Sequence, residues 1–329
     1  MSVKERKSKR LICKQATHSH NPSRHLHTDV ALALNQLKVA GSRRELLGSE
    51  EAPVYRQIIR YQSGKTMVFG LMALYEPGTN AASLVDDQTV EQLDVAQVAP
   101  PQREDGKREE FINSLLFFAV YKNFVVAMQS MQLRTDHLES HLNWLLRTAS
   151  AIKKNEYYGL LDLPTPSAKD KLFSAPIKEI NLGAQPLFVL SSQAVDAGKG
   201  VASTELHTSW ASAGLDFLKG LLSPAQYAKL DSEKMEQSNI EYSLRIKCRT
   251  STTEADHKLL RNVATALRNH DLEDTKITLA DGKEIQGNDL KLTQDVRVDT
   301  YNGIPYPESV FEEMRQWLHQ LVASKAIGP

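Results

Sequence analysis

The sequence contains few cysteines and no long apolar run. Its 329 residues include only two cysteines, Cys13 and Cys248, each among apolar neighbours in a strand-like segment. Two such cysteines do not make the disulfide framework of a secreted protein, so we expect buried thiols in a reducing compartment. No stretch of about 18 apolar residues occurs, and no apolar segment follows the basic start MSVKERKSKR. We therefore expect a cytoplasmic chain with no membrane-spanning helix and no secretory signal.

Net charge is also missing, because 40 Lys and Arg residues balance 40 Asp and Glu residues. The balance is uneven along the chain: residues 1–60 carry 12 basic against 5 acidic side chains. A basic segment beside a mildly acidic remainder indicates a local anionic partner, and not a surface that coats nucleic acid uniformly.

Signatures of catalysis are missing as well. Gln62-Ser63-Gly64-Lys65-Thr66 ends like a phosphate-binding loop but lacks the upstream glycine, and it fits a hairpin turn better. No Gly-x-Ser-x-Gly motif and no supported Cys–His pair occurs. We expect no cofactor and favour a binding protein over an enzyme, although scattered carboxylates leave a metal-dependent nuclease open.

Apolar periodicity predicts an α+β protein of two domains, with antiparallel sheets and helices packed on one face. The expected strands and hairpins lie at 10–16, 54–74, 93–98, 115–128, 241–249, 276–286 and 290–300, and the expected helices at 29–39, 135–147, 203–231, 253–268 and from 307 onward. The expected divisions are a basic arm at 1–10, an N-terminal α+β domain at 11–150, a linker and helical insertion at 151–237, and a C-terminal β-α-β-β-β-α domain at 238–329.

The expected strand at 241–249 alternates strictly in character. Tyr242, Leu244, Ile246 and Cys248 share one face, and the other face carries Arg245, Lys247 and Arg249, spaced about 6–7 Å apart by strand geometry. That spacing suits the phosphates of a nucleic-acid backbone. The strand at 290–300 adds Lys291 and Arg297, but its aspartates reduce the field. An ordinary solvated face with cross-strand ion pairs remains an alternative.

Further basic residues gather near the start of the chain. A flexible basic arm commonly reaches for nucleic acid, although it also serves as a solubilising tail. Because no zinc-finger spacing or RNA-platform motif occurs, we expect backbone-directed binding with weak sequence preference. The candidate contacts of this region are Lys4, Arg6, Lys7, Lys9, Arg10, Arg43, Arg44, Arg56 and Arg60.

Four histidines fall within the segment THSHNPSRHLHT. His18 and His20 have the His-x-His spacing that places both rings on one face of an extended segment, and His25 and His27 repeat it. Only Asp29 is near as a further ligand, so we favour a solvent-facing or locally hydrogen-bonded loop over a metal site.

The order of elements resembles a known family. The segment FFAVYKNFVVAMQSMQLRTDHLESHLNWLL, an inserted region, then SLRIKCRT, a helix to Arg268, an Asp-Gly hairpin, a strand to Tyr301 and a last helix resemble the layout of the RexA phage-exclusion proteins. The resemblance covers about residues 110–325. It implies a dimeric two-domain α+β protein that binds DNA with little sequence preference and acts in phage exclusion. The basic start and the histidine segment depart from that pattern.

Three functions follow as hypotheses. The first is a non-sequence-specific DNA-binding protein of a phage-defence or mobile-element system, acting as a dimer or as a subunit of a complex. The second is a metal-dependent nuclease or toxin-like effector. The third is a protein–protein adaptor in a multi-subunit defence complex, because residues 76–109 and 150–202 are loosely patterned and suit partner-dependent ordering.

Overall fold

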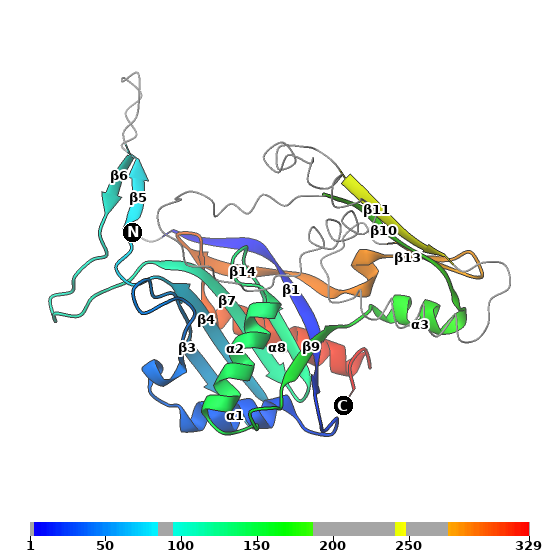
Figure 1. Cartoon of the computed structure of the whole chain (residues 1–329), viewed down its shortest axis with the longest axis horizontal. Helices are drawn as coiled ribbons and strands as arrows, with labels where there is room; N and C mark the ends of the chain where they lie inside the picture. The colour runs from blue at the N-terminus through cyan, green and yellow to red at the C-terminus, as the bar shows by residue number, and fades with distance from the viewer. Residues whose placement is uncertain (1–2, 85–94, 187–240, 248–275, 329) are drawn as a thin grey trace, which may run out of the picture. The chain divides into compact units, whose positions relative to one another are not determined.

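The computed structural model describes residues 3–84, 95–186, 241–247 and 276–328. The chain divides into two compact units (Figure 1). Unit 1 comprises residues 1–165 and 291–329, and unit 2 comprises residues 166–290. Within the described residues, no helix is long and apolar enough to cross a membrane.

Unit 1 is built around one large antiparallel sheet whose path is β15-β14-β1-β8-β7-β4-β3-β2, with β9 also paired to β1. Its strands are β1 (Lys4–His18), β2 (Arg44–Leu46), β3 (Tyr55–Ser63), β4 (Met67–Tyr75), β7 (Ile112–Tyr121), β8 (Phe124–Met128), β9 (Tyr158–Asp162), β14 (Leu292–Tyr301) and β15 (Ile304–Pro305). Its helices are α1 (Leu26–Gln36), η1 (Ala40–Arg43), α2 (Thr135–Thr148) and α8 (Pro307–Ala323). A separate hairpin pairs β5 (Ala81–Leu84) with β6 (Val95–Val98).

Helices cover both faces of this sheet (Figure 1). Val68 of β4 and Phe118 of β7 pack in a cluster with α1 and α2, whereas their neighbours Phe69 and Phe117 pack in a second cluster with α8. We expected helices on one face only. The central strands are apolar at nearly every position, and strands of that kind need cover on both sides. At Gly70 the ring of Phe118 occupies the space that a Cβ atom would need, so only glycine fits there.

Most of the expected elements of unit 1 are confirmed. The hairpins β3–β4 and β7–β8 form around Gly64 and Lys122, and Lys122 adopts the left-handed conformation of a tight turn at φ 50°. Helices α2 and α8 begin at Thr135 and Pro307, as expected, and Pro307 occupies the first turn of α8. The α+β class is therefore confirmed.

Unit 2 holds a four-stranded antiparallel sheet of order β11-β10-β12-β13. Its described elements are α3 (Pro166–Ser174), β10 (Ile177–Pro186), β11 (Glu241–Lys247), β12 (Lys276–Leu279), β13 (Glu284–Gln286) and η2 (Gly287–Leu290). Ile180, Ile277 and Ile285 form its small core. The expected Asp-Gly hairpin is confirmed as β12–β13, with Gly282 at φ 82°. The helices expected at 203–231 and 253–268 lie outside the described residues.

Two expected divisions of the chain differ from the structure. The C-terminal domain expected at 238–329 is split, because β11 to β13 belong to unit 2 while β14 and α8 belong to unit 1. The basic arm expected at 1–10 is the first half of β1, paired with β14 from Lys4 to Cys13. Both differences have one cause: β14 forms backbone hydrogen bonds along an edge of β1, a contact between the two ends of the chain that local patterning cannot reveal.

Candidate nucleic-acid interface

The first half of β1 and most of β14 form a two-stranded ribbon at one side of the large sheet. Lys4 to Cys13 pair with Tyr301 to Leu292 on one edge of β1, whereas β8 joins the opposite edge only between Ile12 and Gln15. Between Lys4 and Leu11, no other described strand pairs with that opposite edge. We call this pair of segments, Lys4–Leu11 with Gln294–Tyr301, the ribbon (Figure 1).

The two faces of the ribbon differ because residues directly opposite each other on paired strands share a face. One face carries Val296 and Val298, which are buried against α8. The other face is exposed from end to end on β1, and we call it the outer ribbon face. It consists of Lys4, Arg6, Ser8 and Arg10 from β1 and of Asp295, Arg297, Asp299 and Tyr301 from β14.

The outer ribbon face carries four cations against two carboxylates. Lys4 Nζ lies 2.9 Å from Asp299, and Arg10 Nε lies 3.0 Å from Asp295. Arg6 extends across β14, with Nε 3.6 Å from Asp299 and Nη2 donating to the carbonyl of Arg297 at 3.2 Å. The hydrogen bond to Asp299 raises the pKa of Lys4 above its usual value and keeps the ammonium charged. Arg6 Nη2 also lies 3.8 Å from Glu313 of α8, so a smaller excess of positive charge remains around this face.

These ion pairs are open to water. The side chains of Lys4, Arg6 and Arg10 keep 56%, 61% and 62% of their surface exposed. Exposed pairs of this kind contribute little to stability, so their cations can turn to a phosphate at small cost. A strand face with cross-strand ion pairs and a face that contacts nucleic acid were alternatives from the sequence. On the outer ribbon face the two are thus compatible.

The remaining basic residues of this end of the chain lie off the outer ribbon face. Lys7 pairs with Glu5 at 3.0 Å, and by register both side chains belong to the face that carries Val296. Lys9 belongs to the same face and is half-buried. Lys291 is half-buried just before β14. These three cations add to the local field without sharing the exposed row.

Arg43 and Arg56, two predicted contacts, are buried and cannot reach a partner from this conformation. Arg43 donates from Nε to the carbonyl of Ile58 at 3.1 Å and from Nη1 to two carbonyls after α1, and burial lowers its pKa. Arg56 forms a fork with one oxygen of Glu45 at 3.0 and 2.9 Å. Both predictions must be corrected, because these guanidinium groups satisfy buried acceptors of the fold.

Arg44 and Arg60, the other two predicted contacts of the region, are exposed, and each contacts another side chain. The guanidinium of Arg44 lies 4.3 Å from the ring centroid of Tyr55, a cation–π contact. Arg60 pairs with Glu308 in the first turn of α8. Neither belongs to the ribbon.

The predicted basic strand at 241–249 is described only in part. Its backbone forms β11, in which Arg245 pairs with Asn181 and Lys247 pairs with Glu179. Arg249 and the side chains of Arg245 and Lys247 lie outside the described residues. The hypothesis of three consecutive cations on this strand therefore stays a prediction.

The histidine segment is held together by its own hydrogen bonds. His18 ends β1 in a buried position, and its Nδ1 accepts from the amides of His20 and Asn21 at 3.2 and 3.0 Å. His25 precedes α1 and His27 lies inside it. Among the residues that the structure describes, no three His, Cys, Asp or Glu side chains are close enough to hold a metal ion.

Buried ionic groups elsewhere in unit 1 tie elements together. Asp29 of α1 accepts from Arg24 at 2.7 Å and from the Tyr158 hydroxyl at 2.6 Å. His141 of α2 is fully buried, with its Nδ1 2.8 Å from Glu45. Burial lowers the pKa of His141 more than Glu45 raises it. These groups lie in the packed interior, so we assign them to the fold.

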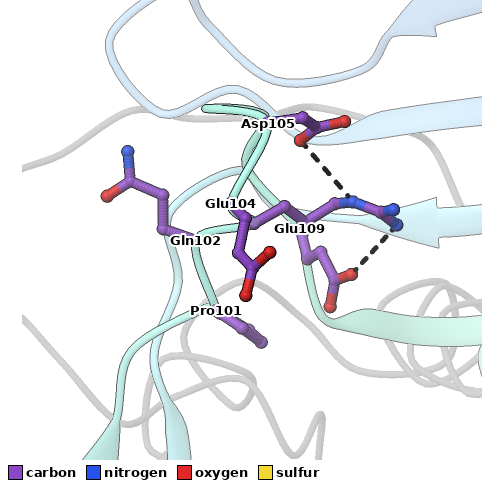
Figure 2. A pocket seen from close by; sticks show the side chains of 6 residues that line it. Pro101, Gln102, Glu104, Asp105 and Glu109 are labelled. Atoms are coloured by element: carbon purple, nitrogen blue, oxygen red, sulfur yellow. Dashed lines mark ion pairs between the residues drawn. The ribbon is translucent and has the colours of Figure 1, made fainter.

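A hollow of about 490 Å³ lies in the turn between β6 and β7 (Figure 2). Arg103 lies between two carboxylates, with Nε 3.6 Å from Asp105 and Nη1 3.5 Å from Glu109. All three side chains are exposed. Arg103 pairs with two of the three lining carboxylates within one turn, which favours a structural role. Its lining residues are Pro101, Gln102, Arg103, Glu104, Asp105 and Glu109.

Sequence reasoning missed the aromatic end of the ribbon. Tyr301, Ile304 and Tyr306 are exposed there, around the turn at Asn302-Gly303. An Asn-Gly pair between a strand and an apolar residue is a strong hairpin signal, and it could have located this turn.

The chain matches no protein-family model, and no curated protein matches it.

Proposed function

We propose that this protein binds nucleic acid, and DNA above all, through the outer ribbon face and without strong sequence preference. The observation that supports the proposal is the row of exposed cations Lys4, Arg6 and Arg10 beside Arg297 on the neighbouring strand. A two-stranded antiparallel ribbon has the width that the major groove of DNA accepts.

The charge and spacing of the face suit contacts to phosphate. Lys4 and Arg6 are two residues apart, which places their Cα atoms about 6.6–6.8 Å apart along the strand. The face has no Asn or Gln, the amide side chains that read adenine by paired hydrogen bonds. Contacts from Lys and Arg to phosphate fix position and carry no sequence information.

The first test removes the positive row. A Lys4→Gln/Arg6→Gln/Arg10→Gln variant should bind a random 20-base-pair duplex at least tenfold more weakly in fluorescence anisotropy. The slope of log K against log salt should become shallower by about 2–3, since each phosphate contact contributes about 0.9. The matched control is Arg103→Gln/Lys107→Gln/Arg108→Gln, which removes three exposed cations elsewhere in unit 1. Equal loss in both variants would contradict a ribbon site.

The second test has the opposite sign. Asp295 and Asp299 neutralise part of the face, so Asp295→Asn/Asp299→Asn should bind the same duplex several-fold more tightly at low salt. This gain cannot arise from a damaged fold, which makes it the stronger control. Unchanged or weaker binding would argue against an electrostatic interface on the ribbon.

A role in phage exclusion and a dimeric state rest on the family resemblance and stay predictions. Sedimentation of the purified chain and plaque counts on cells that express it test them. A nuclease or toxin-like effector predicts metal-dependent loss of plasmid or RNA upon incubation, and an adaptor predicts a protein that co-purifies after nuclease treatment. The row of cations favours nucleic-acid binding over both.

A further inference from the structure

The end of the ribbon is a tight turn that presents aromatic rings. β14 and β15 pair Tyr301 with Ile304 across Asn302 and Gly303. Both turn residues have positive φ, 50° and 84°, as in the hairpin turns that Asn-Gly sequences favour. Asn302 also ties the turn to β1, because its Oδ1 accepts from the amide of Val3 at 3.0 Å. The turn is thus fixed from both sides.

The rings lie on the outer ribbon face. Tyr301 is directly opposite Lys4, and Ile304 is directly opposite Tyr301, so all three share that face. Tyr306 lies two residues beyond Ile304 and contacts Tyr301 edge to face, with ring centroids 5.5 Å apart at 85°. The exposed fractions are 36% for Tyr301, 61% for Ile304 and 40% for Tyr306.

The ring of Tyr306 is held in place without any ligand. The amide of Tyr306 donates to the carbonyl of Asp299 at 2.8 Å, and Tyr306 caps the start of α8. A hydrogen bond between its hydroxyl and Glu308 raises the pKa of Tyr306, so the phenol stays neutral. A fixed ring loses little conformational entropy upon stacking, which favours binding.

A cross-strand aromatic pair also stabilises a hairpin by itself. That role does not account for the cations beside it: Lys4 lies opposite Tyr301, and Arg6 lies opposite Asp299, the next residue of that face. Rings beside cations are the combination that binds single strands, because bases stack on the rings while phosphates meet the cations. A paired duplex offers its base faces only at its ends.

We propose that an unpaired base stacks on one of the two perpendicular rings of Tyr301 and Tyr306, with the other ring beside it, while the adjoining phosphates contact Lys4 and Arg6. This inference rests on the proposed function and narrows the ligand to a single strand, or to a duplex with an unpaired end. DNA and RNA share this chemistry, and parallel measurements with oligo-dT and oligo-rU of one length distinguish them.

The experiment separates the base from the phosphate. A 15-nucleotide oligo-dT and an abasic strand of the same length carry the same phosphates, but only the first has bases. The full chain should bind oligo-dT about tenfold more tightly than the abasic strand in anisotropy, within the range expected for one or two stacked bases. The Tyr301→Ala/Tyr306→Ala variant should bind both strands with the affinity that the abasic strand shows for the unaltered chain.

Two further variants distinguish loss of stacking from loss of the fold. Tyr301→Phe/Tyr306→Phe keeps both rings and should restore the preference for oligo-dT. Tyr157→Ala removes a tyrosine that is 52% exposed away from the ribbon, and it should leave the preference unchanged. Loss of the preference in the Phe variant would overturn stacking, because both rings remain in that variant.

The remaining outcomes are distinct. If the unaltered chain binds both strands equally and the Gln variant of Lys4, Arg6 and Arg10 binds neither, stacking is wrong while the proposed function stands. If the unaltered chain binds no nucleic acid at low salt, both proposals fail.

Discussion

The two halves of β1 place the same kinds of side chain in opposite surroundings. From Lys4 to Arg10 the strand pairs only with β14, and its lysine and arginines on the outer face are exposed. Between Ile12 and Gln15 it has partners on both edges, and β9 follows β14 along one edge as far as His18. Lys14 is buried there beside Asp162, with Nζ 2.7 Å from the carboxylate. One strand thus contains a surface that is free to bind and a segment that holds the sheet together.

The two halves differ in the surroundings of the carboxylate that would remain if its cationic partner were removed. Removing Lys14 would strand a buried carboxylate, whereas removing Arg10 would leave an aspartate that water already solvates. A buried charge without its partner is costly, and an exposed one is not.

The largest effect is expected at Lys14. The Lys14→Met variant should lose about 3–5 kcal/mol of unfolding free energy in urea denaturation, because the Asp162 carboxylate then stays buried without its partner. The Lys14→Met/Asp162→Leu variant should recover much of that loss. A loss below about 1 kcal/mol in the single variant would show that the two halves of β1 do not differ in this way.

Cysteine reactivity compares the halves directly. Burial raises the pKa of Cys13 to about 12, and the side chain has no exposed surface. In a Cys248→Ser chain at pH 8, Cys13 should react with a thiol reagent roughly a thousandfold more slowly than an ordinary cysteine, since few thiolates form. A Ser8→Cys/Cys13→Ser/Cys248→Ser chain places a thiol in the exposed half and should react rapidly. Similar rates would contradict the contrast.

His18 gives the buried half a dependence on pH. Burial lowers its pKa below the usual value, so below about pH 6.5 the unfolded chain takes up a proton that the native state resists. The unfolding free energy should therefore fall as the pH drops from about 7 to 5. His18→Asn keeps an acceptor for the amides of His20 and Asn21 and should make this fall shallower. The exposed His20→Asn control should not, and an equal change in both variants would exclude His18 as the cause.

The smallest effect on stability is expected in the exposed half. Arg10→Gln should change the unfolding free energy by less than about 0.5 kcal/mol. The same variant should lower duplex affinity and make the salt slope shallower by about 0.9, the contribution of one phosphate. A stability loss as large as that of Lys14→Met would mean that Arg10 supports the fold instead of the interface.

Local patterning predicted those elements that carry their own signals. The hairpins around Gly64, Lys122 and Asp281-Gly282 follow from turn residues, and the helices beginning at Thr135 and Pro307 follow from apolar spacing. Each of these depends on residues within a few positions of one another.

The ribbon has no such signal. Lys4 to Arg10 contains no apolar residue, so periodicity predicted a strand only from Arg10 onward, whereas β1 begins at Lys4. The strand there follows from its pairing with β14, nearly the whole chain away. The sequence also does not show which acceptor each arginine binds. Arg10 and Arg56 look alike in sequence, but the acceptor of Arg56 is a buried carboxylate on a neighbouring strand.

The candidate site was therefore predicted residue by residue and not as a surface. Lys4, Arg6, Arg10 and Arg297 were each expected to contact nucleic acid, but their convergence on one face, together with Tyr301, required the register of β1 and β14.

The pairing of Lys4 with Tyr301 has a consequence for biosynthesis. β1 leaves the ribosome before β14, which follows only after all of unit 2 has been translated. Unit 2 is one continuous segment and can fold before β1 and β14 pair. The ribbon forms last and slowly, as contacts of large sequence separation do. A chain truncated before β14 would contain the basic residues of β1 but not the residues of β14 that pair with them. Such truncated chains should therefore lack the binding surface.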